Sequence, residues 1–125
     1  MEKGSRRTES KFGHFNVLVN NAGILGPIKT TTEISESEYL KVIDINQNSI
    51  FYGMKYTIPS MLKSGIGSIV DISSAAGIVA IPGYPSLAYM GSKFAVRGLT
   101  KLRQWNMEGI ILEQTRSIPA ISKRL

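Results

Sequence analysis

The chain has 125 residues, the length of a single domain, and a hydrophobic content of 42% that is typical of a globular protein. It has no cysteine and one histidine, His14, which excludes a disulfide framework and a zinc site, so we expect no bound metal. No signal peptide is visible at residues 1–7, and no apolar run reaches the ~18 residues that cross a bilayer. We therefore expect a soluble, cytoplasmic protein without a membrane partner.

The net charge of +6 is concentrated at the two ends of the chain. Residues 1–12 carry four basic and two acidic side chains, residues 101–125 five and two, and residues 13–100 six and five. A nucleic-acid-binding protein gathers its charge on one face or helix, often between aromatic residues. The ends show no such order, so we do not expect nucleic acid to bind.

Residues 1–12 are polar and without a pattern, and the first predicted element is a short strand, FNVLVN at 15–20. Its apolar, β-branched run is typical of a parallel strand that is covered on both faces. Asn21, Ala22 and Gly23 follow at its carboxyl end, where open α/β sheets bind ligands. The same residue types are also common in turns, so a simple turn is the alternative.

A long helical segment comes next. Ser35 and Glu38 have the spacing of a capping box, and apolar residues then recur at helical spacing over 39–45 and again over 50–62. The pattern is interrupted at Asn46, which is either a satisfied buried amide or a functional group. The residues alone favour the amide.

Pro59 is expected to bend or break this helix, and the glycine-containing segment 64–67 to end it. The second strand is GSIVDI at 67–72. Small residues follow it at 73–77, and they would let a ligand approach the backbone. The alternation of strand and helix predicts right-handed βαβ units, and therefore an α/β fold with a parallel sheet.

The last predicted element is an apolar helix that contains Tyr89. Tyr89 and Lys93 are four residues apart, so their side chains share one face of this helix. An ammonium group beside a phenol favours the phenolate, which would make the phenol a proton donor and acceptor nearer neutral pH. Taken alone, the pair is also consistent with two surface residues of an amphipathic helix.

Four segments occur in the order and approximate spacing of the short-chain dehydrogenase/reductase family: NNAG at 20–23, Asn46, ISS at 72–74 and YMGSK at 89–93. The chain resembles this family from about residue 12 to residue 101. The resemblance implies a doubly wound Rossmann fold. It also implies an oxidoreductase that transfers hydride between a nicotinamide cofactor, NAD or NADP, and a small-molecule alcohol or ketone.

The resemblance also implies a role for each matching residue. Tyr89 is expected to be the general acid/base, and Lys93 to lower its pKa and to bind the ribose of the nicotinamide. Ser74, the second of two neighbouring serines, would hold the substrate oxygen, and Asn46 a water that links Lys93 to solvent. The residues that would line the cofactor crevice, besides Tyr89 and Lys93, are Asn20, Ala22 and Gly23.

The sequence departs from the family in its outer parts. Full Rossmann domains are roughly twice as long, and the glycine-rich turn that binds the pyrophosphate on the first strand is absent, as is the residue that distinguishes NAD from NADP. We therefore expect a fragment, a single partial Rossmann domain over residues 1–125 with a family-like core at 12–101. It would lack the first βαβ half and the C-terminal strands.

Residues 1–7 and 102–125 are atypical of the family. Permitted codons allow a shifted frame in which the C-terminal segment resembles the family's next helix and strand. Our hypothesis is that both ends are frameshift products, which resequencing of the gene tests.

Two expectations concern partners and activity. In the family, the helices that carry Asn46 and Tyr89 pack against a partner subunit, so we expect a homo-oligomer through these helices. The alternative to an enzyme is a catalytically inactive fragment, at most a protein-interaction module.

Overall fold

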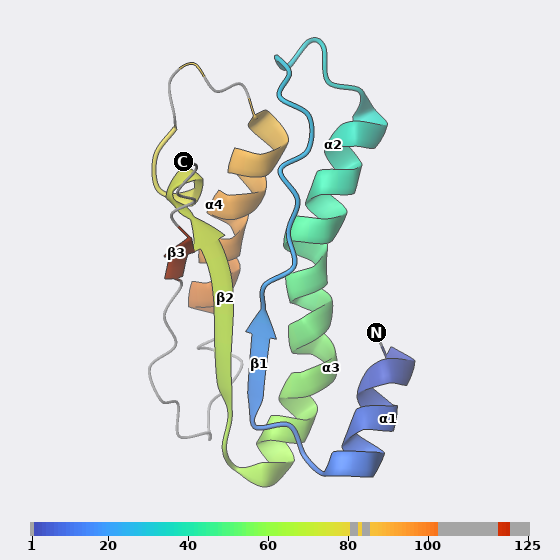
Figure 1. Ribbon diagram of the computed structural model, residues 1–125. Coiled ribbons are helices and arrows are strands. Elements are labelled where there is room, and N and C mark those ends of the chain that lie inside the picture. The colour runs from blue at the N-terminus through green and yellow to red at the C-terminus, as the bar shows by residue number, and fades with distance from the viewer. Residues whose placement is uncertain (1, 81–82, 84–85, 103–117, 121–125) are drawn as a thin grey trace.

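A computed structural model describes residues 2–80, 83, 86–102 and 118–120 of the chain. Strands and helices alternate along the chain, and Figure 1 shows the helices running along the strands. The elements are α1 (Glu2–Phe12), β1 (Val17–Asn20), α2 (Glu36–Ile43), a π-helical turn η1 (Asp44–Asn48), α3 (Ser49–Ser64), β2 (Ser68–Ser74), a 3-10 turn η2 (Ala75–Gly77), α4 (Leu87–Leu102) and β3 (Ile118–Ala120). Of the described helices, none is long and apolar enough to cross a membrane.

The three strands form one parallel sheet in the order β1-β2-β3. The parallel α/β fold that the alternation of elements predicts is therefore confirmed. Strand β3 lies in a segment where we expected no strand, and it pairs with Ile72, Ser73 and Ser74. Three residues with a central proline carry no alternating apolar pattern, so the sequence could not reveal this strand. Most of the segment 102–125, to which the frameshift hypothesis applies, lies outside the described residues.

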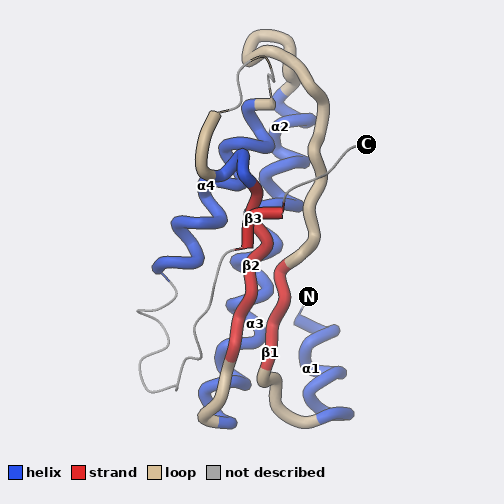
Figure 2. The backbone as a smooth tube through the Cα atoms, turned by 60° about the vertical axis from the view of Figure 1, so that its left-hand side comes forward, coloured by secondary structure: helices blue, strands red, loops and turns tan. Residues whose placement is uncertain are grey.

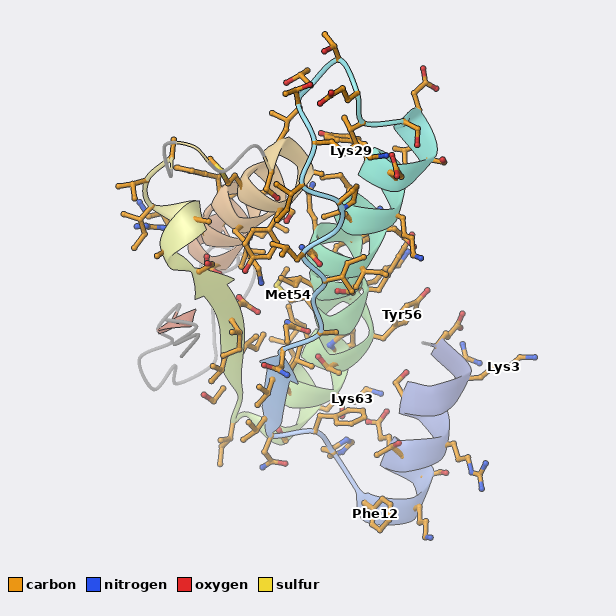
Figure 3. The ribbon with its side chains drawn as sticks, turned by 45° about the horizontal axis from the view of Figure 1, so that its top comes forward. Lys3, Phe12, Lys29, Met54, Tyr56 and Lys63 are labelled. Carbon is orange, nitrogen blue, oxygen red and sulfur yellow. The ribbon has the colours of Figure 1, made fainter. Side chains whose placement is uncertain are left out.

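Helix α1 occupies a segment in which the sequence has no apolar pattern, and none of its residues is buried. Polar contacts join it to α3. Ser60 Oγ donates to Glu9 Oε1 at 2.6 Å, and the backbone N–H of Phe15 donates to Ser60 Oγ at 3.0 Å. In Figure 3, α1 runs beside the part of α3 that carries Lys63. Because polar contacts hold this helix, hydrophobic periodicity could not have predicted it.

One apolar core lies between the sheet and helices α3 and α4. Its buried residues are Ile50, Met54, Met61, Ile69 and Val96. Leu18 of β1 packs against this core, whereas Val17 and Val19, on the other face of the strand, are 60% and 56% exposed. Figure 2 shows α3 and α4 on the same side of the strands. The described helices α3 and α4 therefore cover one face of the sheet.

Helix α2 begins with the capping box that the sequence predicts. The backbone N–H of Glu38 donates to Ser35 Oγ at 3.3 Å, and the N–H of Ser35 donates to Glu38 Oε2 at 2.9 Å. Lys29, in the loop beside α2 in Figure 3, donates to Glu38 Oε1 at 2.8 Å. The Lys29 ammonium and the Ser35 donors lower the pKa of Glu38 to about 2. These contacts fix the loop that follows β1 against α2.

Pro59 lies inside α3 and the helix continues to Ser64, so of the two expected effects, a bend or a break, the break does not occur. Because Pro59 is exposed, water can bind the carbonyl group that loses its helical partner. Gly65 ends the helix as expected, with a left-handed φ of 72° that glycine adopts without steric cost.

Gly77 of η2 lies close to the backbone of α4, and substitution there tests this packing. A β-carbon on Gly77 would lie 2.5 Å from the carbonyl oxygen of Lys93 and 2.7 Å from Ser73 Oγ. We expect Gly77→Ala to lower the free energy of unfolding by about 1–3 kcal/mol, because η2 and α4 must separate. Urea unfolding followed by circular dichroism measures this change.

Gly98→Ala in α4 is the matched control, because a β-carbon there has no neighbour within 4 Å among the described residues. Alanine is the better helix former, so this variant should be as stable as the parent or up to about 1 kcal/mol more stable. Equal effects of the two substitutions would contradict the close approach of η2 to α4.

Candidate active site

The elements that carry the predicted site residues meet at one end of the sheet. Strands β1 and β2 are parallel, and both arrows in Figure 1 point toward the end of the fold at which α4 begins. Asn20 ends β1, Ser74 ends β2, and Tyr89 lies in the first turn of α4. In open α/β sheets the carboxyl ends of the strands are where ligands bind.

Lys93 connects α4 to β2. Its side chain is buried, with the residue only 5% exposed, and its Nζ donates to the carbonyl oxygen of Ile72 at 2.9 Å. The Nζ also lies 5.7 Å from the centre of the Tyr89 ring, one helical turn earlier. Burial lowers the pKa of Lys93, because the charged form loses hydration. The shared helix face that the spacing predicts is confirmed for this pair, and Lys93 is not a surface residue.

The two neighbouring serines at the end of β2 make different contacts. Ser73 Oγ donates to the carbonyl oxygen of Lys93 at 3.1 Å and so helps to hold α4 on the sheet. Ser74 Oγ accepts from the backbone N–H of Ala76 at 3.2 Å, as the cap of η2. The hydroxyl hydrogen of Ser74 can therefore still be donated, whereas that of Ser73 is already used.

Asn46 is a satisfied buried amide, as the residues alone suggested. It is 0% exposed and lies in the π-helical turn η1. Its Oδ1 accepts from the N–H of Ile24 at 2.8 Å, and its Nδ2 donates to the carbonyl oxygen of Ile24 at 2.9 Å and to Ser92 Oγ at 3.0 Å. The side chain thereby joins the loop after β1 to α4.

Gly23 lies beside this cluster, but Asn20 does not. A β-carbon on Gly23 would be 3.5 Å from both Asn46 Oδ1 and Lys93 Nζ. The Asn20 amide instead donates to Asp71 Oδ1 at 2.8 Å on the helix-covered face of the sheet. Ala22 is exposed. The structure thus brings Gly23, Asn46 and Lys93 together and directs the Asn20 side chain elsewhere.

Two buried polar residues of this region were missed by the sequence reasoning. Asp71 accepts from Asn20 and, through Oδ2, from Thr100 Oγ1 at 2.8 Å. An acidic residue within the apolar run IVDI was the signal that could have identified it, because a buried charge needs partners. Ser92 contacts Asn46, and nothing in its local sequence points to that contact.

A separate apolar pocket of about 340 Å³ lies between α2 and the start of α4. The residues that line it are Thr31, Ile34, Ser35, Glu36, Tyr39, Leu40 and Leu87. Leu87 and Tyr89 are two residues apart on a helix, so their side chains point to different faces. This pocket is therefore distinct from the Tyr89–Lys93 cluster.

Comparison with known proteins gives concordant matches. The family model "short chain dehydrogenase" matches residues 1–110. The chain is 42% identical over 92 residues to cyclohexanol dehydrogenase of Acinetobacter sp., covering 74% of this chain and 36% of that protein. It is 46% identical over 94 residues to 3beta-hydroxysteroid dehydrogenase of Mediterraneibacter gnavus, covering 74% of this chain and 33% of that protein. The chain therefore spans about one third of the length of these curated relatives.

Solved structures agree with the sequence matches. The crystal structure of gox2181 superposes with a TM-score of 0.81 at 27% identity, covering 87% of this chain and 43% of that one. The structure of ElxO with NADP bound has a TM-score of 0.80 at 34% identity, covering 90% of this chain and 44% of that one. Both are Rossmann-fold proteins, so the partial Rossmann fold that the sequence predicts is confirmed. Since the family model extends over most of the sequence, the chain belongs to the short-chain dehydrogenase family.

Proposed function

We propose that this chain carries the proton-transfer part of an NAD(P)-dependent oxidoreductase acting on an alcohol or ketone. One observation carries the proposal: the buried Lys93 ammonium lies one helical turn from Tyr89, at the carboxyl ends of two parallel strands. A surface Tyr–Lys pair would not bury a cation. Burial of this charge is costly, and a functional requirement accounts for it.

The residues at this end of the sheet fit the nicotinamide end of the cofactor. Gly23 leaves the space beside Lys93 Nζ free of a side chain, so Gly23, Lys93 and Tyr89 would hold the nicotinamide ribose. Bound there, the cofactor supplies or accepts the hydride. The NADP named in the ElxO structure supports NAD(P) as the class, and both forms are to be tested.

Each protein group then has one task in the proposed reaction. In reduction, the Tyr89 hydroxyl gives its proton to the ketone oxygen, and in oxidation the Tyr89 oxygen takes it from the alcohol. The Ser74 hydroxyl donates a hydrogen bond to the same oxygen and stabilises the charge that develops there. The Lys93 ammonium stabilises the phenolate of Tyr89, and Asn46 holds the loop that carries Gly23 in place.

The names of the relatives, a cyclohexanol and a hydroxysteroid dehydrogenase, support an alicyclic secondary alcohol as substrate. Ile78 and Val79, which follow η2 soon after Ser74 in the sequence, are exposed apolar residues. An apolar substrate would cover them. We therefore propose cyclohexanol as the first substrate to test and the cytoplasm as the compartment.

A second candidate function is that of an inactive fragment or interaction module. The observation that favours it is the uncovered face of β1, where Val17 and Val19 are more than half exposed. Parallel strands are normally covered on both faces, so a protein partner would gain from covering this one.

The expected homo-oligomer also becomes a specific proposal. The long helices expose large apolar side chains, of which Phe51 lies on α3 and Phe94 on α4. Such side chains are typical of surfaces that bind another protein. We propose that a second copy of the chain covers them.

The enzymatic proposal predicts that Tyr89 is essential. The 125-residue chain should bind NADH or NADPH saturably, measured by fluorescence titration, and should oxidise cyclohexanol. Tyr89→Phe should lower kcat by about 10²–10⁴-fold, because the transferable proton is lost, and should weaken cofactor binding much less, because Gly23 and Lys93 still hold the ribose. Tyr52→Phe, an exposed tyrosine on α3, is the control and should be fully active. Full activity of Tyr89→Phe would refute the role, and absence of cofactor binding would favour the inactive fragment.

Lys93 predicts a pH dependence of stability. Its pKa is lowered in the folded state, so between that value and the ordinary ~10.4 the unfolded chain binds more protons than the folded chain. Titration of Lys93 should therefore raise the free energy of unfolding of the parent protein as the pH rises through this window. Lys93→Met should lack that contribution, whereas Lys41→Met, at an exposed site, should retain it. Urea unfolding at several values between pH 7 and 11 measures the difference, and a pH-independent difference would contradict it.

The oligomer is tested by placing a charge on its proposed surface. Phe94→Glu should convert the oligomer into a monomer, because a carboxylate would be desolvated in the contact. Ile66→Glu, at an exposed apolar residue between α3 and β2, should leave the mass unchanged. Light scattering after size-exclusion chromatography gives the masses. A monomeric parent chain at micromolar concentration would refute the contact.

A further inference from the structure

Ser92 has no part in the proposed proton transfer, yet it is completely buried, with 0% exposed. Its Oγ donates to the carbonyl oxygen of Tyr89 at 2.7 Å. A serine bonded to the carbonyl group three residues earlier is common in helices and needs no further role. The contact that needs explaining is the hydrogen bond that Ser92 Oγ accepts from Asn46 Nδ2 at 3.0 Å, because it joins α4 to a different element, η1.

The directions of these hydrogen bonds form one chain of donors. Since the Ser92 hydrogen is given to Tyr89, the Ser92 oxygen acts as an acceptor toward Asn46. The other hydrogen of the Asn46 amide goes to the carbonyl oxygen of Ile24, and Asn46 Oδ1 accepts from the N–H of Ile24. Every polar group of the Asn46 side chain is therefore used, and its orientation follows from this network.

The loop bound by Asn46 is the one that passes beside Lys93. Gly23 directly precedes Ile24, and a β-carbon on Gly23 would lie 3.5 Å from Lys93 Nζ. The position of this loop beside the ammonium therefore depends on Asn46. Asn46 in turn is bound to α4 through Ser92.

We propose that Ser92 is a positioning residue, whose hydroxyl fixes the first turn of α4, with Tyr89, relative to the Gly23–Ile24 loop by way of Asn46. The catalytic consequence of this role rests on the proposed function. The physical link between α4 and the loop does not, because it consists of contacts within the chain.

Removal of the hydroxyl has a specific local effect. In Ser92→Ala, one N–H of a fully buried amide loses its acceptor, and an unsatisfied buried donor is unfavourable. Asn46 must then shift or admit water. Either response weakens its two hydrogen bonds to Ile24 and changes the surroundings of Lys93.

The test is NMR spectroscopy of the isotopically labelled chain, without cofactor or substrate. In Ser92→Ala, hydrogen exchange at the Ile24 N–H and the Asn46 side-chain amide should accelerate by about fivefold to tenfold relative to the amides of β2. The titration of the Lys93 ammonium should also move toward that of an ordinary lysine, because water gains access. The proposal requires both changes.

Thr57→Val is the matched control. Thr57 Oγ1 also donates to a carbonyl oxygen of its own helix, that of Gly53 at 2.8 Å, and Thr57 is also buried, but it does not bind Asn46. Valine keeps the size and replaces the hydroxyl with a methyl group. If the two variants change exchange at Ile24 and the Lys93 titration equally, or if neither variant changes them, Ser92 is only an intrahelical serine and the proposal is refuted. An inactive chain would leave this test intact, so the two proposals can fail separately.

Discussion

The arrangement of the site depends on one buried cation. An ammonium group that leaves water must find oxygen acceptors, and in this fold Lys93 finds the carbonyl oxygen of Ile72. That single bond fixes α4 against β2 at the level of Tyr89. Ser73 of β2 adds a second hydrogen bond between β2 and α4, because its Oγ donates to the carbonyl oxygen of Lys93. Gly77 permits it, because any side chain there would meet the same carbonyl group.

The wide turn η1 explains how Asn46 reaches this cluster. Val42, Asn46 and Ile50 are buried at intervals of four residues. In a regular α-helix with 3.6 residues per turn, each step of four turns the side chain by about 40°, so the direction drifts slowly along the helix. A π-helical turn has a longer repeat, so it reduces this drift and keeps the three side chains more nearly in line. The irregular turn therefore lets one amide face the site while the apolar residues on either side of it stay in the core.

Features that depend on residue spacing within one element could be predicted from the sequence. The direction of a side chain toward a different element could not. Four-residue spacing placed Tyr89 and Lys93 on one face, and the capping box located the start of α2. The direction of the Asn20 side chain was not predictable, because it depends on Asp71 of the neighbouring strand. Ser92 was missed for the same reason, since its important contact comes from another helix. Helix α1 was missed because polar contacts, which leave no periodic pattern, join it to α3.

The contacts that build the proton-transfer cluster all lie between Gly23 and Lys93, within a region that buries its own core. Its geometry therefore follows from contacts within this chain. Cofactor affinity has a different origin, because it comes largely from backbone N–H groups that bind the pyrophosphate at a glycine-rich turn, and the sequence contains no such motif. A well-formed Tyr89–Lys93 cluster and a weak affinity for the dinucleotide are thus physically compatible. For this reason cofactor binding and proton transfer have to be measured as separate properties.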